Sequence, residues 1–239
     1  MSFLPKHLIQ ITTLVFVFTA GLTGCSSEKA TEENGALSLN EWLDAKYEEQ
    51  LLRSPMNLTY LGRDERKDEI DEFTLASYQA DLAWQAASVA EMANRFDRAK
   101  LSEPEQLSYD LWKYSYEQSA AGEAYFYNGL VFDQMNGIHA FVPTFLINFH
   151  TVANVSDFEA LVARLKLIKP RMMDALDIAR ESSNRGVVAP YFAMEGVADQ
   201  SRKIISGQPF EADAETDSAI WADIQRKAQG LLDEGLLTE

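Results

Sequence analysis

A run of apolar residues at seven-residue intervals dominates residues 70–97. Leu75, Leu82, Val89 and Phe96 follow one another at this spacing, with alanine and charged residues between them. This repeat places the four side chains on one face of an α-helix, because an α-helix turns once every 3.6 residues or so. We therefore predict a long helix over residues 70–97 whose apolar face lies in the protein core.

Three capping boxes indicate where other helices begin. In each, a serine is followed three residues later by a glutamate, and the serines are Ser38, Ser102 and Ser156. The serine side chain accepts a hydrogen bond from the free backbone N–H groups of the first turn, and the glutamate returns one. The helix that begins at Ser156 is expected to break or kink at Pro170 and to end before Gly186.

The chain as a whole is therefore predicted to be all-α, a multi-helix array of packed helix pairs with roughly seven helices and almost no strand. Loops are expected at residues 56–62 and at the densely charged residues 63–72. The expected helices cover residues 38–53, 70–97, 102–122, 142–149, 156–184, 190–206 and 218–234. On the helix expected at residues 102–122, one face is continued by Leu107, Leu111, Tyr114 and Gln118.

The first 25 residues have the pattern of a lipoprotein signal peptide. A short basic start is followed by an apolar run, then by Leu22, Thr23 and Gly24 and by Cys25. The apolar run is too short for a standard membrane span. We predict that residues 1–24 are removed and that Cys25 receives a lipid; the alternative is an ordinary secretory peptide with a chance cysteine.

The predicted anchor determines where the protein resides and how it is organised. Ser26 after the lipidated cysteine favours the outer membrane, so we expect an outer-membrane lipoprotein facing the periplasm. Residues 25–37 are polar and are expected to be a flexible tether. Residues 38–239 are expected to form the helical domain. Cys25 is the only cysteine in the sequence, which leaves no disulfide to be formed.

The formal net charge of −16 bears on the class of partner. Nucleic acid is disfavoured, because its phosphates would be repelled by an acidic surface. Anionic lipid head groups are disfavoured for the same reason, so the predicted contact with the membrane is through Cys25 alone. The composition does not indicate an oligomeric state.

Aromatic residues crowd residues 123–154, where glycines and a proline interrupt any regular period. We predict a long, partly buried loop with a short helix near 142–149. Within it, Gln134 and His139 are candidates for lining a substrate cleft, and Tyr191 is a third, from the segment 186–191. The alternative for His139 is a structural histidine with its hydrogen bonds satisfied. The sequence contains no recognisable metal-ligand cluster, phosphate-binding loop or nucleophile elbow.

Five segments in order resemble the bacterial family named domain of unknown function 885. The first is Ser54-Pro55 with Thr59-x-Leu61-Gly62. The others are residues 101–111, residues 132–137 with 143–146, residues 155–159 with 163–165, and residues 185–190. Together they span about residues 38–210.

The resemblance implies a longer protein than this chain. Members carry His-Glu-x-x-Pro-Gly-His and a later Glu-Gly-Trp in their C-terminal half, similar to gluzincin zinc peptidases, in which zinc activates a water. This chain has neither motif, so no catalytic or metal-binding residue is assigned and zinc is expected only in the missing half. The resemblance thus implies the N-terminal part of a larger gluzincin-like helical fold, inactive alone, with peptides as substrates of the whole protein.

The alternative is a genuine short form, a non-catalytic helical lipoprotein that binds a partner or a small ligand. If the chain is instead one half of a two-lobed fold, part of its apolar surface should be exposed. We expect that surface on the C-terminal helix, which has Ile220, Trp221, Ile224, Leu231, Leu232, Leu236 and Leu237.

Overall fold

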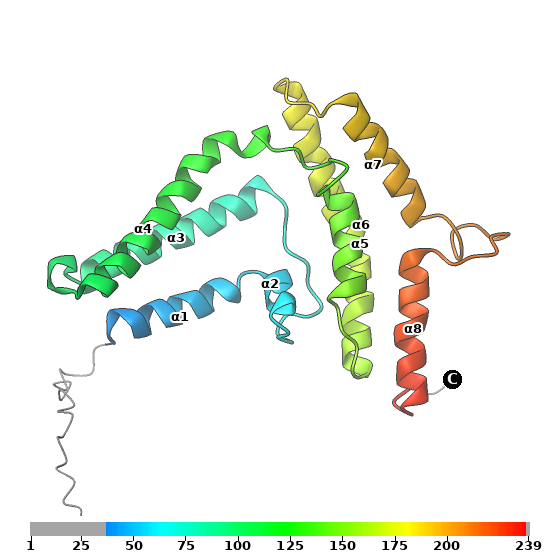
Figure 1. The fold of residues 1–239 in the computed structure, drawn as a ribbon, viewed down its shortest axis with the longest axis horizontal. Coiled ribbons are helices and arrows are strands. Elements are labelled where there is room, and N and C mark those ends of the chain that lie inside the picture. Colours follow the sequence, from blue (N-terminus) through cyan, green and yellow to red (C-terminus); the bar gives the residue numbers. More distant parts are fainter. Residues whose placement is uncertain (1–36, 238–239) are drawn as a thin grey trace, which may run out of the picture. The chain divides into compact units, whose positions relative to one another are not determined.

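The computed structural model describes residues 37–237, which contain eight α-helices and no strand (Figure 1). The prediction of an all-α multi-helix fold is confirmed. The signal peptide, the lipidated Cys25 and residues 25–36 of the tether lie outside the described residues. The helices are α1 (Leu39–Leu51), α2 (Pro55–Tyr60), α3 (Leu75–Arg95), α4 (Glu103–Gly122), α5 (Ile138–Asn148), α6 (Val155–Asn184), α7 (Tyr191–Ile204) and α8 (Ala219–Asp233); two 3-10 helices, Arg98–Lys100 and Glu123–Asn128, flank α4. No helix within residues 37–237 is long and apolar enough to cross a membrane.

Two of the three predicted capping boxes are present. Ser38 and Glu41 cap α1, and Ser102 and Glu105 cap α4. The third was placed two residues late, because Asn154 caps α6 by accepting a hydrogen bond from the backbone N–H of Asp157 at 3.0 Å. Asparagine is as good an N-cap as serine, so the earlier residue begins the helix.

Helix α6 is continuous over 30 residues and includes Pro170, so of the predicted break or kink the break does not occur. Pro170 is exposed. On the solvent side of a helix, the carbonyl that loses its partner can be hydrated. Similarly, α5 contains Pro143 and begins at Ile138, four residues before the expected start.

Residues 56–62 were predicted as a loop, but most of them belong to α2. The side chain of Ser54 caps this helix and Pro55 occupies its first turn. Both are helix-start signals, and the six-residue length explains why no apolar period is visible. Residues 63–72 are not helical, but they are not fully solvated, since Lys67 and Ile70 are buried.

The main core lies around α5 and α6. Its buried members include Val142, Phe145 and Leu146 from α5 and Leu161 and Ala175 from α6. Met56 of α2 and Ile70 join them, and Ile220 and Ile224 of α8 pack against the group. The expectation that α8 exposes its apolar face is therefore wrong for most of its length, although Leu236 beyond its end is exposed.

A second, smaller core joins α1, α3 and α4. Leu39, Trp42 and Met92 are its buried members, and Phe96 and Trp112 pack against them. The predicted apolar stripe of α3 does face inward: Leu82 is buried, and Leu75, Val89 and Phe96 are half-buried.

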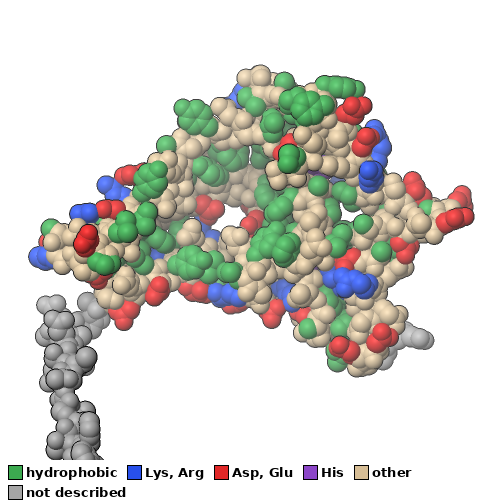
Figure 2. All heavy atoms as spheres, in the orientation of Figure 1, with side chains coloured by type: hydrophobic (Ala, Val, Ile, Leu, Met, Phe, Trp, Pro, Cys, Tyr) green, Lys and Arg blue, Asp and Glu red, His purple; other side chains and the backbone are tan. Residues whose placement is uncertain are grey.

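The interior face of α4 is not the face that Leu107, Leu111 and Tyr114 form. These three residues are 54–61% exposed. Trp112 instead points inward, and its indole N–H donates to Ser88 of α3 at 3.1 Å. Hydrophobic side chains are visible along α4 in Figure 2.

Candidate functional site

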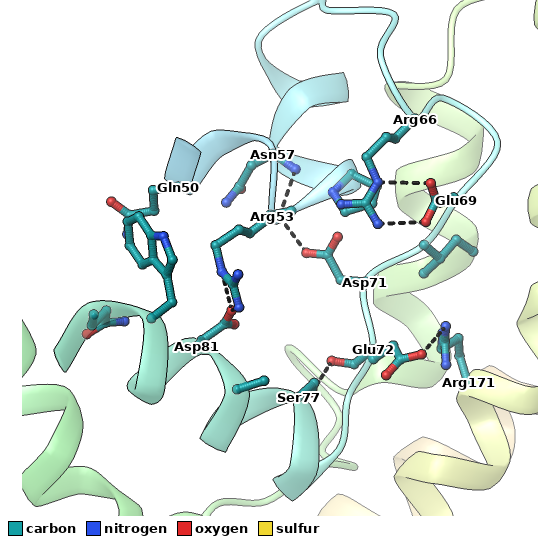
Figure 3. Close-up of a pocket in the computed structure, with 16 residues that line it drawn as sticks. Gln50, Arg53, Asn57, Arg66, Glu69, Asp71, Glu72, Ser77, Asp81 and Arg171 are labelled. Carbon is teal, nitrogen blue, oxygen red and sulfur yellow. Dashed lines mark hydrogen bonds and ion pairs between the residues drawn. The ribbon is translucent and has the colours of Figure 1, made fainter. Parts of the chain in front are cut away.

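A polar hollow of about 440 Å³ lies where the end of α1, the start of α2, residues 66–72, α3 and α6 meet. We call it the charged hollow, because three arginines and four acidic residues line it. Figure 3 shows their side chains, and Figure 2 shows the hollow as an opening with acidic side chains at its rim. The charged residues are Arg53, Arg66, Arg171, Glu69, Asp71, Glu72 and Asp81.

Each arginine of the charged hollow is paired with a carboxylate that lines it, and Arg171 also pairs with Asp174 at 3.1 Å. Arg53 donates to Asp81 with its Nε and a terminal nitrogen, at 2.8 and 2.6 Å. Arg66 holds both oxygens of Glu69, and Arg171 lies 3.2 Å from Glu72 (Figure 3). The hydrogen bonds from Arg66 lower the pKa of Glu69 below its usual value. The walls are therefore oriented by their own ion pairs.

Asp71 is the one carboxylate of this set without an arginine contact. It accepts from the Ser54 hydroxyl at 2.6 Å and from the backbone N–H of Met56 at 3.0 Å. These bonds fix the first turn of α2 against residues 66–72. Arg66, which begins this wall, has φ of +54°, a conformation that costs a non-glycine residue about 1–3 kcal/mol.

Two buried atoms at this site have no hydrogen-bond partner among residues 37–237. One is the side-chain oxygen of Gln85 and the other is Nε of Arg171. Both residues line the charged hollow. Buried polar groups are normally paired, so these two atoms are exceptions within this part of the fold.

The charged hollow was not predicted from the sequence, because its residues come from five segments between Gln50 and Arg171. Each arginine or carboxylate alone reads as a surface charge. The only local signal was the Ser54-Pro55 helix start. In the fold, the hydroxyl of Ser54 donates a hydrogen bond to Asp71.

Gln134 and His139, two of the predicted cleft residues, are brought together by a residue that was not predicted. Nε2 of His139 lies 2.8 Å from the amide oxygen of Gln200, whose amide nitrogen donates to the backbone carbonyl of Gln134 at 2.8 Å. The other ring nitrogen of His139 is buried without a partner among the described residues. Gly137 is required here, since a Cβ would lie 2.5 Å from the His139 ring.

Tyr191, the third predicted cleft residue, begins α7 and is 80% exposed. No hydrogen bond within residues 37–237 joins it to Gln134 or His139. The segment before it nevertheless meets the aromatic loop. Residues 129–132, 179, 182–183 and 187–189, together with Met194, line an apolar hollow of about 180 Å³. We call this the apolar hollow.

His150 lies in a separate, fully buried network. Arg164, which is 0% exposed, donates to the Nδ1 atom of His150 at 2.9 Å, to the Thr59 hydroxyl at 2.7 Å and to the carbonyl of Glu69 at 2.8 Å. Nε2 of His150 lies 2.9 Å from the carbonyl oxygen of Asp157. Because these contacts link α2, residues 66–72 and α6, the network holds two walls of the charged hollow in place.

Residues 55–237 match the family described as "Bacterial protein of unknown function (DUF885)". The chain belongs to this family. The match includes every residue that lines the apolar hollow, and all that line the charged hollow except Gln50, Arg53 and Ser54. No curated protein and no solved structure matched the chain significantly.

Over residues 37–237, no group of three or more histidine, cysteine, aspartate or glutamate side chains is arranged to hold a metal ion. The described residues therefore do not provide a set of ligands that fits a zinc ion.

Proposed function

We propose that this chain is a lipid-anchored protein of the cell envelope and the non-catalytic helical part of a zinc-peptidase-like protein. Its role in this proposal is to bind an extended peptide, while zinc chemistry belongs to a C-terminal half of the kind that the family resemblance implies. The observation that carries the proposal is the apolar hollow beside a non-helical, partly exposed segment at residues 187–190.

The backbone of residues 187–190 is suited to pairing with a second strand. Its first residue is fixed, because the N–H of Val187 donates to the carbonyl of Ser182 at 2.9 Å. Val188 is 67% exposed, and no hydrogen bond within residues 37–237 engages the backbone N–H of Val188 or Ala189. An extended peptide laid along this segment would receive main-chain hydrogen bonds, as in other cases of strand addition.

The apolar hollow supplies the place for a peptide side chain. It is lined by Val131, Val187 and Met194, among others. Ser182 also lines it, and the hydroxyl of this residue is buried without a partner among the described residues. Alternate side chains of a bound strand point to the same face, so one apolar side chain of the peptide would enter the hollow.

Strand pairing is tested by removing one N–H group. Replacing Val188 with proline removes the donor, whereas Val188→Thr retains it with a similar β-branched shape. The probe is a fluorescein-labelled random-coil peptide library rich in leucine and phenylalanine, measured by fluorescence anisotropy. We expect Val188→Pro to weaken binding about tenfold and Val188→Thr to change it less than about twofold. Equal binding by the two variants would refute this site.

The lipid anchor is tested separately with Cys25→Ser. We expect the unmodified chain to be recovered with outer membranes and the variant to be recovered in the soluble periplasmic fraction, because the acyl chains supply the membrane affinity. Membrane recovery of the variant would contradict the predicted lipidation.

The exposed face of α4 favours a second candidate function, a lipoprotein that binds a partner protein. Leu107, Leu111 and Tyr114 form an apolar stripe on that face. Such stripes mark interaction sites more often than isolated apolar residues do. Loss of co-purification with a defined partner on Leu111→Lys, with peptide binding retained, would separate this candidate from the first.

A further inference from the structure

A groove of about 370 Å³ lies between the start of α3, the segment that follows the second 3-10 helix, and α6. Apolar side chains form most of its lining, and two carboxylates, those of Glu72 and Asp81, complete it. We call it the amphipathic groove. We propose that it binds a basic side chain, a lysine or an arginine, of the peptide that the apolar hollow holds, a proposal that rests on the function proposed above.

The amphipathic groove and the apolar hollow share one wall. Gly129, Leu130 and Val131 line both of them, and Leu130 is 43% exposed. The shared wall is a single stretch of chain, and each residue of a bound strand advances about 3.3 Å. A peptide with one apolar side chain in the hollow therefore brings a side chain a few positions away to the groove.

Both charged residues that line the amphipathic groove are acidic, and each is engaged through only one oxygen. Oε1 of Glu72 accepts from Arg171 at 3.2 Å, and Oδ1 of Asp81 accepts both hydrogen bonds from Arg53 (Figure 3). Within residues 37–237, no hydrogen bond engages the other oxygen of either carboxylate. An ammonium or guanidinium group could bind these two oxygens while both ion pairs stay intact.

The neighbouring arginines do not cancel this acidity. Arg53 and Arg171 line the charged hollow but not the amphipathic groove. Arg171 is shared between Glu72 and Asp174, so one guanidinium faces two carboxylates. Glu123 adds a carboxylate without an ion pair among the described residues, at the start of the 3-10 helix that supplies one wall. The groove therefore attracts a cation and repels an anion.

The apolar lining favours a long organic cation over a small inorganic one. Phe73, Tyr78 and Phe126 supply aromatic rings, and Ile178 of α6 supplies an aliphatic side chain. The Tyr78 and Phe126 rings lie 5.4 Å apart, and the Tyr78 hydroxyl is held by donating to the carbonyl of Ser119 at 2.6 Å. Lysine and arginine cover apolar surface with their methylene stems while the charged end stays polar, and aromatic faces attract cations.

The groove is tested first without a peptide. The purified protein is titrated, with binding followed by NMR, with phenethylamine, phenethyl alcohol, ethylamine and hydrocinnamate, which differ in charge or in apolar area. We expect phenethylamine to bind at least about fivefold more tightly than each of the other three, and its advantage over phenethyl alcohol to shrink when salt is raised to about 0.5 M. Equal binding of phenethylamine and phenethyl alcohol would overturn the proposal.

Variants then locate the binding. The double variant Glu72→Gln with Asp81→Asn removes both charges of the groove, and both side chains are more than half exposed, so folding is retained. Asp199→Asn is the matched control, because Asp199 is also exposed and paired with one arginine but lies outside the groove. The preference for phenethylamine should fall below about twofold in the double variant and stay unchanged in Asp199→Asn. A preference that survives in the double variant would refute the assignment.

The peptide itself is tested with fluorescein-labelled peptides that carry one leucine and, two to four residues to either side, a lysine, a norleucine or a glutamate. At one spacing, lysine should bind at least about threefold more tightly than norleucine in the unmodified chain but not in the double variant. A lysine without effect at every spacing would overturn the proposal, even where Val188→Pro weakens peptide binding. If Val188→Pro and Val188→Thr bind equally while phenethylamine keeps its preference, the peptide site at residues 187–190 fails and the groove stands as a site for an organic amine.

Discussion

Mild acid should destabilise this protein through His150. The guanidinium of Arg164 can only donate, so the Nδ1 atom of His150 is an acceptor and its Nε2 atom carries the hydrogen that is donated to the carbonyl of Asp157. The ring is 1% exposed and is therefore held neutral in a place that water does not reach.

The pKa of His150 is lowered to about 4, and burial is the main cause. The positive charges of Arg164, Lys227 and Lys67 lower it further, and the hydrogen bond to the Asp157 carbonyl opposes them. In the unfolded chain a histidine has a pKa of about 6.5. Between these values the unfolded state binds a proton that the folded state does not, so stability falls as the pH drops below about 6.5. The linkage relation gives a loss of about 2 kcal/mol between pH 7 and pH 5.

The assay is urea unfolding of the unmodified chain and of His150→Gln at pH 7 and pH 5. An amide can accept from Arg164 and donate to the Asp157 carbonyl, but it does not titrate. The free energy of unfolding should therefore fall by about 2 kcal/mol more in the unmodified chain than in His150→Gln over this pH interval. Leu82→Ala is the control, because it removes apolar packing elsewhere and should keep the pH dependence of the unmodified chain.

Equal pH dependence in the unmodified chain and His150→Gln would show that His150 is not the group that binds the additional proton on unfolding. A loss of pH dependence in Leu82→Ala as well would attribute the effect to lowered stability in general. Either outcome would refute the reasoning from the buried network.

Three further predictions concern the same assay. Asp157→Asn should cost about 3 kcal/mol at pH 7, because Lys67 is buried and Asp157 is its only buried partner, 2.8 Å away. Gly207→Ala should cost at least about 2 kcal/mol, because φ is +93° there and a Cβ would lie 2.5 Å from the carbonyl oxygen of Thr216; an unchanged urea midpoint would contradict this. Leu111→Lys should change stability by less than about 0.5 kcal/mol, since its side chain is exposed; a larger loss would mean that this face of α4 is packed.

The start of a helix was predictable where one local hydrogen bond decides it. Ser38 and Ser102 each cap the helix that their capping box predicts. Of the break or kink predicted at Pro170, the break does not occur, because the cost of a proline depends on whether water reaches the freed carbonyl, which is a property of the fold. Asn154 shows a second limit, since two acceptable caps two residues apart cannot be ranked from the sequence alone.

Which face of a helix is buried was predictable for α3 but not for α4. The apolar stripe of α3 has few competitors on the other faces. In α4, by contrast, Leu107 and Leu111 lie on one face and Tyr109 and Trp112 on another, so periodicity supports either. The Trp112 face is buried because Trp112 has partners on other helices: its indole N–H donates to the hydroxyl of Ser88, and its ring packs edge-to-face with Trp42.

The residues of the candidate sites were only partly predictable, because contacts between distant segments also depend on the fold. His139 and Gln134 stood out because they lie in an unusual aromatic loop, and the structure links them through Gln200. The charged hollow did not stand out, because ion pairs between residues as distant as Glu72 and Arg171 leave no trace in local spacing.

The presence of two separate cores has a consequence for how the protein opens. The cluster around Leu39, Trp42 and Met92 shares no residue with the core around α5 and α6. The ends of α1, α3 and α4 can therefore exchange their amide hydrogens by local unfolding, without disturbing the amides of α5. The charged hollow has walls from both regions, with Asp81 on one side and Arg171 on the other. A ligand bound there would slow hydrogen exchange in both regions together and so make the two halves unfold as one.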